Sequence, residues 1–251
     1  YYDRFRSRIM FPIFDSAGRV VAFTGRIFGE DSDAAKYLNS PETELFSKSH
    51  ILHGLNFAKT IIRKLDFAIL VEGQMDLIMA HQIGYSNAVA SSGTALTDSQ
   101  LDILSRLTKK LVIAYDGDGA GIRAAEKAWQ LALVKGFDVK IAELPKGQDP
   151  ADIIKSDPDM WRACIKGGKH VIEFLLKNIL EQEKDARKIG QRVSAELVPY
   201  IKSVESSIDQ SYFIDLIANK ARISRDALWK EAQRVGYSGT NDRRNIPIPK
   251  K

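Results

Sequence analysis

Acidic side chains follow two strongly apolar stretches of this sequence, and their spacing is suited to holding a metal ion. Residues 67–71 lead into Glu72, and residues 111–115 lead into Asp116 and Asp118. Unbroken apolar runs of this length are typical of parallel strands that are covered on both faces. Because ligands bind beyond the carboxyl ends of such strands, we expect the three carboxylates to meet at one edge of a sheet.

Neighbouring carboxylates repel one another and raise each other's pKa unless a cation lies between them. A hard divalent ion with oxygen ligands, Mg²⁺ or Mn²⁺, is the expected cation. Asp76 lies four residues after Glu72 and is predicted either to face the same site or to cap its own helix. A third acidic turn, with Asp149 and Asp152, follows another strand-like run. One such turn has an ordinary structural explanation, whereas three at strand ends favour a site.

Spacing excludes two other phosphate or metal sites. An EF-hand needs an oxygen ligand at the fifth loop position and a glutamate at the twelfth, where this loop has Ala120 and Lys127. A nucleotide P-loop needs a glycine-rich run that ends in Gly-Lys-Ser/Thr, and the sequence has none. The four histidines lack partners at a spacing typical of hydrolases, so we interpret them as packing or surface residues.

The bulk composition limits the class of protein. A chain of 251 residues is long enough for one or two domains. Its net charge of +5 is compatible with a polyanionic partner. The single cysteine, Cys164, argues against a disulfide framework and for an intracellular compartment. The sequence has no signal peptide and no long apolar span, and it starts without methionine inside a patterned segment, so we interpret it as a fragment of a longer, non-membrane protein.

Alternation of strand and helix patterns predicts an α/β fold: a small parallel sheet with helices on both faces, preceded by a basic β-hairpin segment and followed by an α-helical bundle. The hairpin strands are expected at 9–14 and 20–28, and the sheet strands at 67–71, 87–90, 111–115 and 139–144. Beyond residue 157 only helical periodicity is found. The predicted divisions are 1–64 for the hairpin and loop segment, 65–156 for the sheet domain, 157–236 for the helical subdomain and 237–251 for a linker or disordered tail.

Two N-terminal segments are open to both a functional and a structural interpretation. Arg4, Arg6 and Arg8 alternate along the chain, so in extended conformation their guanidinium groups would line one edge. Such a row suits phosphate groups, but it also suits a solvated edge strand protected by charge. Residues 29–49 are predicted to be a long loop, which is either functional or simply ordered and polar.

Taken in order, these motifs resemble the catalytic core of bacterial DnaG-type DNA primases. The acidic turns alone are similar to the Toprim fold, which those primases share with type IA and II topoisomerases and some nucleases. Its pattern is a glutamate after one strand and an Asp-x-Asp pair after a later one. The phrases that narrow the resemblance to the primases are found at residues 4–12, 25–26, 36–43, 71–76, 90–94 and 116–121. The resemblance is close over residues 1–180 and loose over the helical remainder.

The resemblance implies a nucleotidyltransferase, a DNA-directed RNA polymerase that makes short RNA primers on single-stranded DNA from ribonucleoside triphosphates. The catalytic and metal-binding residues carried over by position are Glu72, Asp116 and Asp118, with Asp149 and Asp76 as further metal ligands. The residues expected to hold template and nucleotide phosphates are Arg4, Arg6, Arg8, Arg26, Lys36, Asn39 and Lys48. Family members often have Asp-Pro-Asp where this sequence has Asp149-Pro150-Ala151, so the last ligand position is open, with Asp152 as a possible replacement.

The family also carries an N-terminal zinc-binding domain and a C-terminal helicase-binding domain, neither of which is evident in this sequence. Zinc is therefore expected only in that other domain. A replicative helicase and a single-strand-binding protein are expected as partners of the full-length protein at the bacterial replication fork in the cytoplasm. Two alternatives stay open: a Toprim-type nuclease or topoisomerase-related enzyme, and a non-catalytic nucleic-acid-binding or helicase-docking module. A topoisomerase would need a tyrosine nucleophile, which we do not identify.

Overall fold

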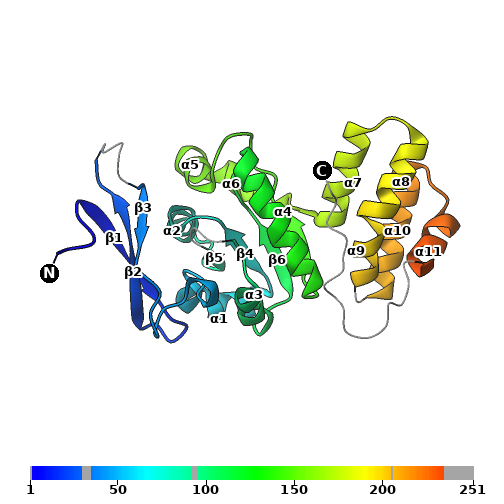
Figure 1. Cartoon of the computed structure of the whole chain (residues 1–251). Coiled ribbons are helices and arrows are strands. Elements are labelled where there is room, and N and C mark those ends of the chain that lie inside the picture. The colour runs from blue at the N-terminus through cyan, green and yellow to red at the C-terminus, as the bar shows by residue number, and fades with distance from the viewer. Residues whose placement is uncertain (1, 30–34, 92–94, 205, 235–251) are drawn as a thin grey trace.

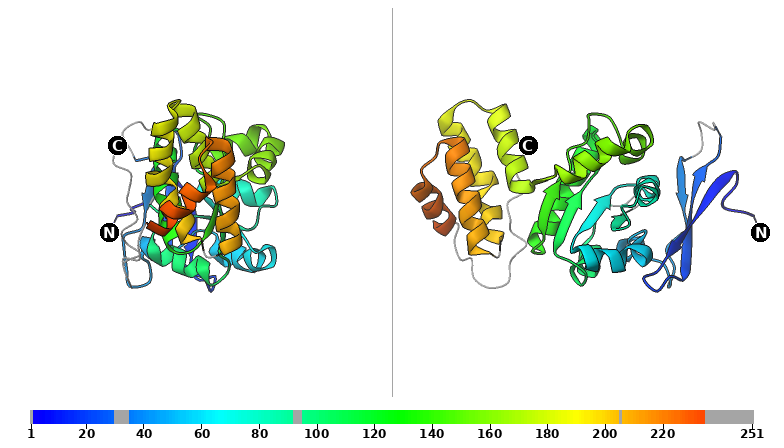
Figure 2. Two further views of the ribbon diagram at one scale, coloured as in Figure 1. Left: turned by 90° about the vertical axis from the view of Figure 1, so that its right-hand side faces the viewer. Right: turned by 180° about the vertical axis from the view of Figure 1, so that it is seen from behind.

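The computed structural model of the chain describes residues 2–29, 35–91, 95–204 and 206–234. These residues form three parts in a row: an antiparallel sheet, a layered α/β body and a helical bundle (Figure 1). The same order is seen from behind in Figure 2. The predicted tail, 237–251, lies outside the described residues.

The first part is the predicted hairpin with one further strand. β1 (Arg8–Phe14) pairs antiparallel with β2 (Val20–Ile27), which confirms the hairpin. β3 (Tyr37–Asn39) pairs with the other edge of β2. The prediction of an unbroken loop over 29–49 is therefore wrong. β3 is only three residues long, so it depends on hydrogen bonds to β2 and leaves no periodicity in the sequence.

The prediction that Arg4, Arg6 and Arg8 line one edge of an extended segment is also wrong. Residues 4–7 form bends and a turn, with Ser7 at a φ of 50°, so the alternation in sequence does not place the three guanidinium groups on one edge. Arg8 instead donates to the carbonyl oxygens of Gly25 (3.2 Å) and Ala35 (2.8 Å). Arg6 donates to the carbonyl oxygen of Asp3 (3.2 Å).

The central sheet has the strand order β5-β4-β6-β7-β8. Its strands are β5 (Ala88–Ala90), β4 (Ala68–Val71), β6 (Lys110–Ile113), β7 (Asp138–Ile141) and β8 (Lys169–His170). The first four are parallel, which confirms the predicted parallel sheet, and β8 pairs antiparallel at the edge. β8 lies in the region predicted to contain helices only. Two residues paired at a sheet edge are too few to show a strand pattern.

Helices cover both faces of this sheet, as the unbroken apolar strands require. One face packs against α1 (Leu55–Leu65), α3 (Asp98–Ser105) and α4 (Gly119–Val134). The other packs against α2 (Gln74–Gln82), α5 (Pro150–Ser156) and α6 (Pro158–Lys166). Along β4, Leu70 belongs to the first core while Ile69 and Val71 belong to the second. Successive side chains point to opposite faces, so both sets are buried.

The helical bundle shares the first of these cores. Its helices are α7 (Val171–Gln182), α8 (Ala186–Glu196), α9 (Val198–Ser203), α10 (Ser207–Ala221) and α11 (Arg225–Arg234). Trp129 of α4 and Tyr200 of α9 meet edge to face at 5.1 Å between ring centroids. The apolar cluster runs on from the sheet into the bundle, so the two parts support one another. None of the described helices has the length and apolar character needed to cross a lipid bilayer.

We predict that Trp161→Ala will lower the free energy of unfolding by about 3–5 kcal/mol. The substitution leaves a cavity in the core that the sheet forms with α2, α5 and α6, and the packing contacts of the indole ring are lost. Trp161 is completely buried in α6, and its ring meets Tyr85 edge to face at 6.0 Å. Its indole nitrogen has no hydrogen-bond partner among the described residues, so Trp161→Phe should cost only about 1–2 kcal/mol. Urea denaturation measures both. Equal losses would contradict a role based on packing volume.

Candidate active site

A cavity of about 440 Å³ lies between the carboxyl ends of the parallel strands and the antiparallel sheet. Acidic side chains come from the turns after β4, β6 and β7, and basic ones mainly from β2 and the segment that contains β3. The acidic lining residues are Glu72, Asp76, Asp116, Asp149 and Asp152. The other polar lining residues include Thr24, Arg26, Lys36, Tyr37, Asn39, Gln74 and Lys155. An acidic wall therefore faces a basic one across a space open to a charged ligand.

Backbone hydrogen bonds hold the second and third acidic turns together. The amide of Gly117 donates to the carbonyl of Gln148 at 3.0 Å, and the amide of Gly147 donates to the carbonyl of Gly117 at 3.0 Å. A Cβ atom at position 117 would collide with the carbonyl oxygen of Pro145. Glycine is therefore required here so that the turn after β6, which carries Asp116, can approach the turn after β7.

Asp118 lies beside this cavity rather than in its lining. Its Oδ1 accepts hydrogen bonds from the backbone amides of Ala120 (2.8 Å) and Gly121 (2.7 Å), so it caps the N-terminus of α4. Its charge is nevertheless close to Glu72: burial raises the pKa of the Glu72 carboxyl, and the Asp118 carboxylate raises it further. The structure thus brings together the predicted trio, with Glu72 and Asp116 in the cavity and Asp118 at its edge.

Asp76 has both of the roles predicted for it, because it lines the cavity and also caps its own helix. Its Oδ2 accepts from the amide of Gly73 at 2.9 Å, which closes the first turn of α2. Its Oδ1 accepts from the amide of Ala151 at 3.1 Å, which ties that turn to the start of α5. Burial raises the pKa of Asp76 to about 6, against the opposing effect of the Gly73 amide. Because both oxygens are engaged by backbone, Asp76 fixes the relative positions of two acidic turns.

The turn after β7 places its carboxylates at the start of α5. Asp149 caps this helix, and its Oδ1 accepts from the amide of Asp152 at 2.6 Å. Asp152 belongs to the first helical turn and lines the same cavity as Asp149. Ala151, where the family often has aspartate, contributes its backbone amide to Asp76. Asp152 is thus available near the position that lacks a carboxylate.

Asp116 has the strongest electrostatic perturbation at the site. Burial, followed by the charges of Asp76, Glu72, Asp149 and Asp118, raises its pKa to about 7. One oxygen of Asp116 (Oδ1) and one of Glu72 (Oε2) are buried without a hydrogen-bond partner in the described part of the chain. Buried carboxylate oxygens are normally satisfied, so these two are free to bind a cation.

The carboxylates do not form a preassembled metal cage. Among residues 2–29, 35–91, 95–204 and 206–234, no three histidine, cysteine, aspartate or glutamate side chains are grouped closely enough to hold an ion by themselves. Mg²⁺ commonly binds one or two carboxylates together with waters and substrate phosphates. The unpartnered oxygens of Glu72 and Asp116 fit an ion of this kind, with the remaining ligands supplied from outside the protein.

The basic wall contains some of the predicted phosphate-binding residues and not others. Arg26, Lys36 and Asn39 line the cavity, and Arg26 lies over the ring of Tyr37 at 5.8 Å from its centroid. Lys48 lines a small recess that shares Asn39 with the cavity. Arg4, Arg6 and Arg8 do not line either space.

Sequence reasoning missed four polar residues of the cavity, which are Thr24, Tyr37, Gln74 and Lys155. Lys155 follows Asp152 by three residues on α5, a spacing that places both on one side of a helix and could have been recognised. Gln74, the first residue of α2, lies two positions after Glu72. Tyr37 gave no such signal, because its place depends on β3.

We predict that, without divalent cations, Asp116→Asn will stabilise the fold, and more so at pH 8 than at pH 5. The folded-state pKa of Asp116 is raised to about 7 from 3.8, so the stability linked to its neutral form is present below about pH 4 and lost as pH rises through 7. Allowing for its partial exposure, the gain at pH 8 should exceed that at pH 5 by about 1–2 kcal/mol. Urea denaturation with a chelator measures it. The exposed Asp226→Asn is the control, and an equal gain in both variants would contradict the prediction.

Two family models match the chain. Residues 1–59 match the N-terminal domain of the DNA primase catalytic core. Residues 69–154 match the Toprim-like family. The two matches lie on the antiparallel sheet with the start of α1, and on the central sheet with α2–α5.

Whole-chain comparisons point the same way. The DNA primase of Listeria monocytogenes is 37% identical over 235 residues, which cover 92% of this chain and 37% of that protein. The chain spans less than two fifths of the length of the curated relatives it matches. A DNA primase domain from Pseudomonas aeruginosa has a TM-score of 0.77 at 33% identity and covers 92% of this chain and 73% of its own. A DnaG primase catalytic domain bound to ssDNA has a TM-score of 0.77 at 34% identity, with 90% and 73% covered. The chain therefore belongs to the DnaG family of bacterial DNA primases, and it matches their catalytic core.

Proposed function

We propose that this chain is the RNA-polymerizing core of a DNA primase, which joins ribonucleotides into short primers on a single-stranded DNA template. The observation that carries the proposal is the cavity in which Glu72 and Asp116, each with an unpartnered buried oxygen, face Arg26 and Lys36. Such a site suits a nucleoside triphosphate. Its phosphates would bind the basic side chains, and the carboxylates would bind the metal ion that accompanies the phosphates. The related catalytic domain solved with ssDNA supports a DNA strand as the template.

In the proposed reaction the 3′-hydroxyl oxygen of the growing primer attacks the α-phosphorus of the incoming ribonucleotide. The new P–O bond forms as the bond to pyrophosphate breaks, and the hydroxyl proton leaves to a base. Glu72 and Asp116, with Asp118 beside them, would hold Mg²⁺ or Mn²⁺, and the ion would supply positive charge that stabilises the negative charge developing during the transfer. In an alternative to its role as a metal ligand, Glu72, whose carboxyl pKa is raised by burial, acts as the base that accepts the hydroxyl proton.

The other residues of the cavity position the reactants. Arg26, Lys36 and Lys155 attract the phosphates of nucleotide and template, and Asn39 offers an amide for hydrogen bonding. Asp149 and Asp152 lie at the start of α5, where they add negative charge close to Asp116. We assign Asp76 to holding the acidic turns in place, because its oxygens are occupied by amides.

For the full-length protein we extend the proposal to the cytoplasmic replication fork. There, a replicative helicase and a single-strand-binding protein would be partners, and zinc would belong to a separate N-terminal domain. The residues Arg4, Arg6 and Arg8 would then contact template outside the cavity rather than the reacting nucleotide.

We predict that Glu72→Gln will reduce primer synthesis on single-stranded DNA about 100-fold or more, with the fold unchanged. The substitution keeps the shape of the side chain and removes only its charge, and Oε2 loses no hydrogen bond to a described residue. The assay supplies template, ribonucleoside triphosphates and Mg²⁺, with Asp226→Asn as the control. Full activity in the variant would contradict the proposal. Cleavage of labelled DNA without nucleotide incorporation would point to a nuclease, and no metal-dependent turnover in the full-length protein would point to a binding module.

We predict that Arg26→Ala with Lys36→Ala will weaken binding of single-stranded DNA of every sequence, because both basic groups line the cavity that we propose receives the phosphates. Each lost contact should reduce the slope of log affinity against log salt by about 0.7. Fluorescence anisotropy between about 50 and 300 mM salt, over which the Debye length falls from about 14 to about 6 Å, measures the slope. Lys64→Ala, on the exposed end of α1, is the matched control. An unchanged slope in the double variant would rule out this surface as the binding site.

A further inference from the structure

A completely buried glutamine, Gln100, joins the first turn of α3 to a segment about fifty residues earlier in the chain. Its Oε1 accepts from the backbone amide of Thr97 at 3.1 Å and so completes the capping box. Its Nε2 donates to the carbonyl oxygens of Lys48 (3.1 Å) and Ile51 (2.8 Å). A capping box needs only the acceptor oxygen. The two donor contacts therefore serve the distant segment.

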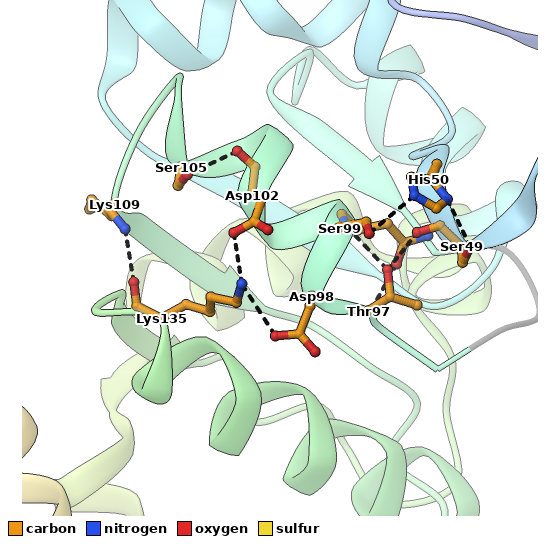
Figure 3. A network of polar contacts seen from close by, with 10 residues as sticks. Ser49, His50, Thr97, Asp98, Ser99, Asp102, Ser105, Lys109 and Lys135 are labelled. Atoms are coloured by element: carbon orange, nitrogen blue, oxygen red, sulfur yellow. Dashed lines mark hydrogen bonds and ion pairs between the residues drawn. The ribbon is translucent and has the colours of Figure 1, made fainter. Parts of the chain in front are cut away.

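Other residues of the same helical turn hold the same segment. The hydroxyl of Thr97 donates to the carbonyl oxygen of Ser49 at 2.6 Å, and the hydroxyl of Ser99 lies 3.3 Å from Nε2 of His50 (Figure 3). Together with the Gln100 contacts, these bonds satisfy the backbone of the short 3₁₀ turn at Lys48–His50. A turn held at the carbonyl oxygens of Lys48, Ser49 and Ile51 has little freedom left to move away from α3.

This turn places Lys48 in a small recess that neighbours the acidic cavity. Lys48 and Asn39 line one recess, and Asn39 also lines the cavity that contains Glu72 and Asp116. The backbone amide of Lys48 donates to Oε1 of Glu42 at 3.0 Å, which lowers the pKa of that carboxyl. Beyond the turn, His53 and Ala90 exchange backbone hydrogen bonds of 2.9 and 3.1 Å, which anchor the segment to β5.

We infer that Gln100 is a positioning residue, whose side-chain amide fixes the Lys48 turn relative to the carboxylates. This inference rests on the proposed function, in which Lys48 contacts phosphate. A turn ordered before binding spares the complex the entropy of ordering it. Loss of the Gln100 donor should therefore weaken binding of nucleotide and template while leaving the rate of the bound complex nearly unchanged.

Gln100→Glu separates this role from that of a helix cap. Glutamate has the same shape and retains an acceptor for the Thr97 amide, but it presents an oxygen to the carbonyls of Lys48 and Ile51. We expect KM for ribonucleotide to rise about tenfold, the energy of one or two lost hydrogen bonds, with kcat within about threefold of the wild type. Amide hydrogen exchange over residues 42–52 should become faster. Lys135→Met, which removes only exposed ion pairs to Asp98 and Asp102 on α3, should change neither.

A double-mutant cycle with Lys48→Ala tests whether Gln100 acts through Lys48. We expect Gln100→Glu to add less than about twofold to KM in the Lys48→Ala background, because the group that it positions is already gone. Should Gln100→Glu not fold, Thr97→Val replaces it. Valine removes the hydroxyl that donates to Ser49 and that also caps α3 by accepting from the Gln100 amide. A KM increase of about threefold is expected, and it supports the inference only if it disappears in the Lys48→Ala background.

The results separate the inference from the proposed function. A wild-type chain that neither binds single-stranded DNA nor incorporates ribonucleotide overturns the proposed function itself. The positioning role is overturned if the wild type is active and Gln100→Glu leaves KM unchanged or lowers only kcat. It is also overturned if Gln100→Glu raises KM by the same factor in the Lys48→Ala background as in the wild type. A rise in KM that disappears in the Lys48→Ala background supports it.

Discussion

Repulsion between carboxylates at the carboxyl ends of parallel strands is the constraint on which this site depends. Asp116 and Glu72 are partly withdrawn from water, and each keeps a buried oxygen without a partner among the described residues. In water such groups ionise at low cost, whereas here burial and neighbouring charge raise both carboxyl pKa values. The fold holds these groups together because apolar cores on both faces of the sheet supply its stability. A bound cation would therefore relieve the repulsion between these carboxylates.

The acidic turns keep their positions through backbone contacts rather than through side-chain ion pairs. Gly117 exchanges hydrogen bonds with the turn after β7, and Asp76 accepts from amides in two turns at once. These contacts connect the ends of three strands into one rigid edge. The basic wall is held differently, through pairing of β3 with β2 and through the contacts of α3 to the Lys48 turn. Acidic and basic walls thus approach each other from separately supported elements.

Much of this architecture could be predicted because the relevant signals are local. The central strands are apolar along their whole length since both faces are covered, and the α3 capping box lies within four residues. The acidic residues directly follow such strands, so their convergence followed from the rule for parallel sheets. The resemblance to primases predicted seven phosphate-binding residues, and three of them, Arg26, Lys36 and Asn39, line the cavity.

The features that escaped prediction depend on contacts between distant segments. β3 and β8 have three and two residues and exist only through pairing, and Ser7 breaks the extended run that alternation of arginines had indicated. The engagement of both Asp76 oxygens requires the start of α5, which lies 75 residues later in the chain. The hydrogen bond from the Gln100 side chain to the Lys48 carbonyl oxygen joins residues that are 52 positions apart. No periodicity or motif in one segment encodes such a pairing.

Isothermal titration of the chain with Mn²⁺, in two buffers that differ in ionisation enthalpy, tests the shared-cation site most directly. Because the Asp116 carboxyl has a pKa of about 7 without a cation, binding at pH 6 must displace a proton, whereas at pH 8.5 the group is already ionised. The account predicts proton release at pH 6 that disappears at pH 8.5. Absence of binding, or binding at pH 6 without proton release, would contradict it.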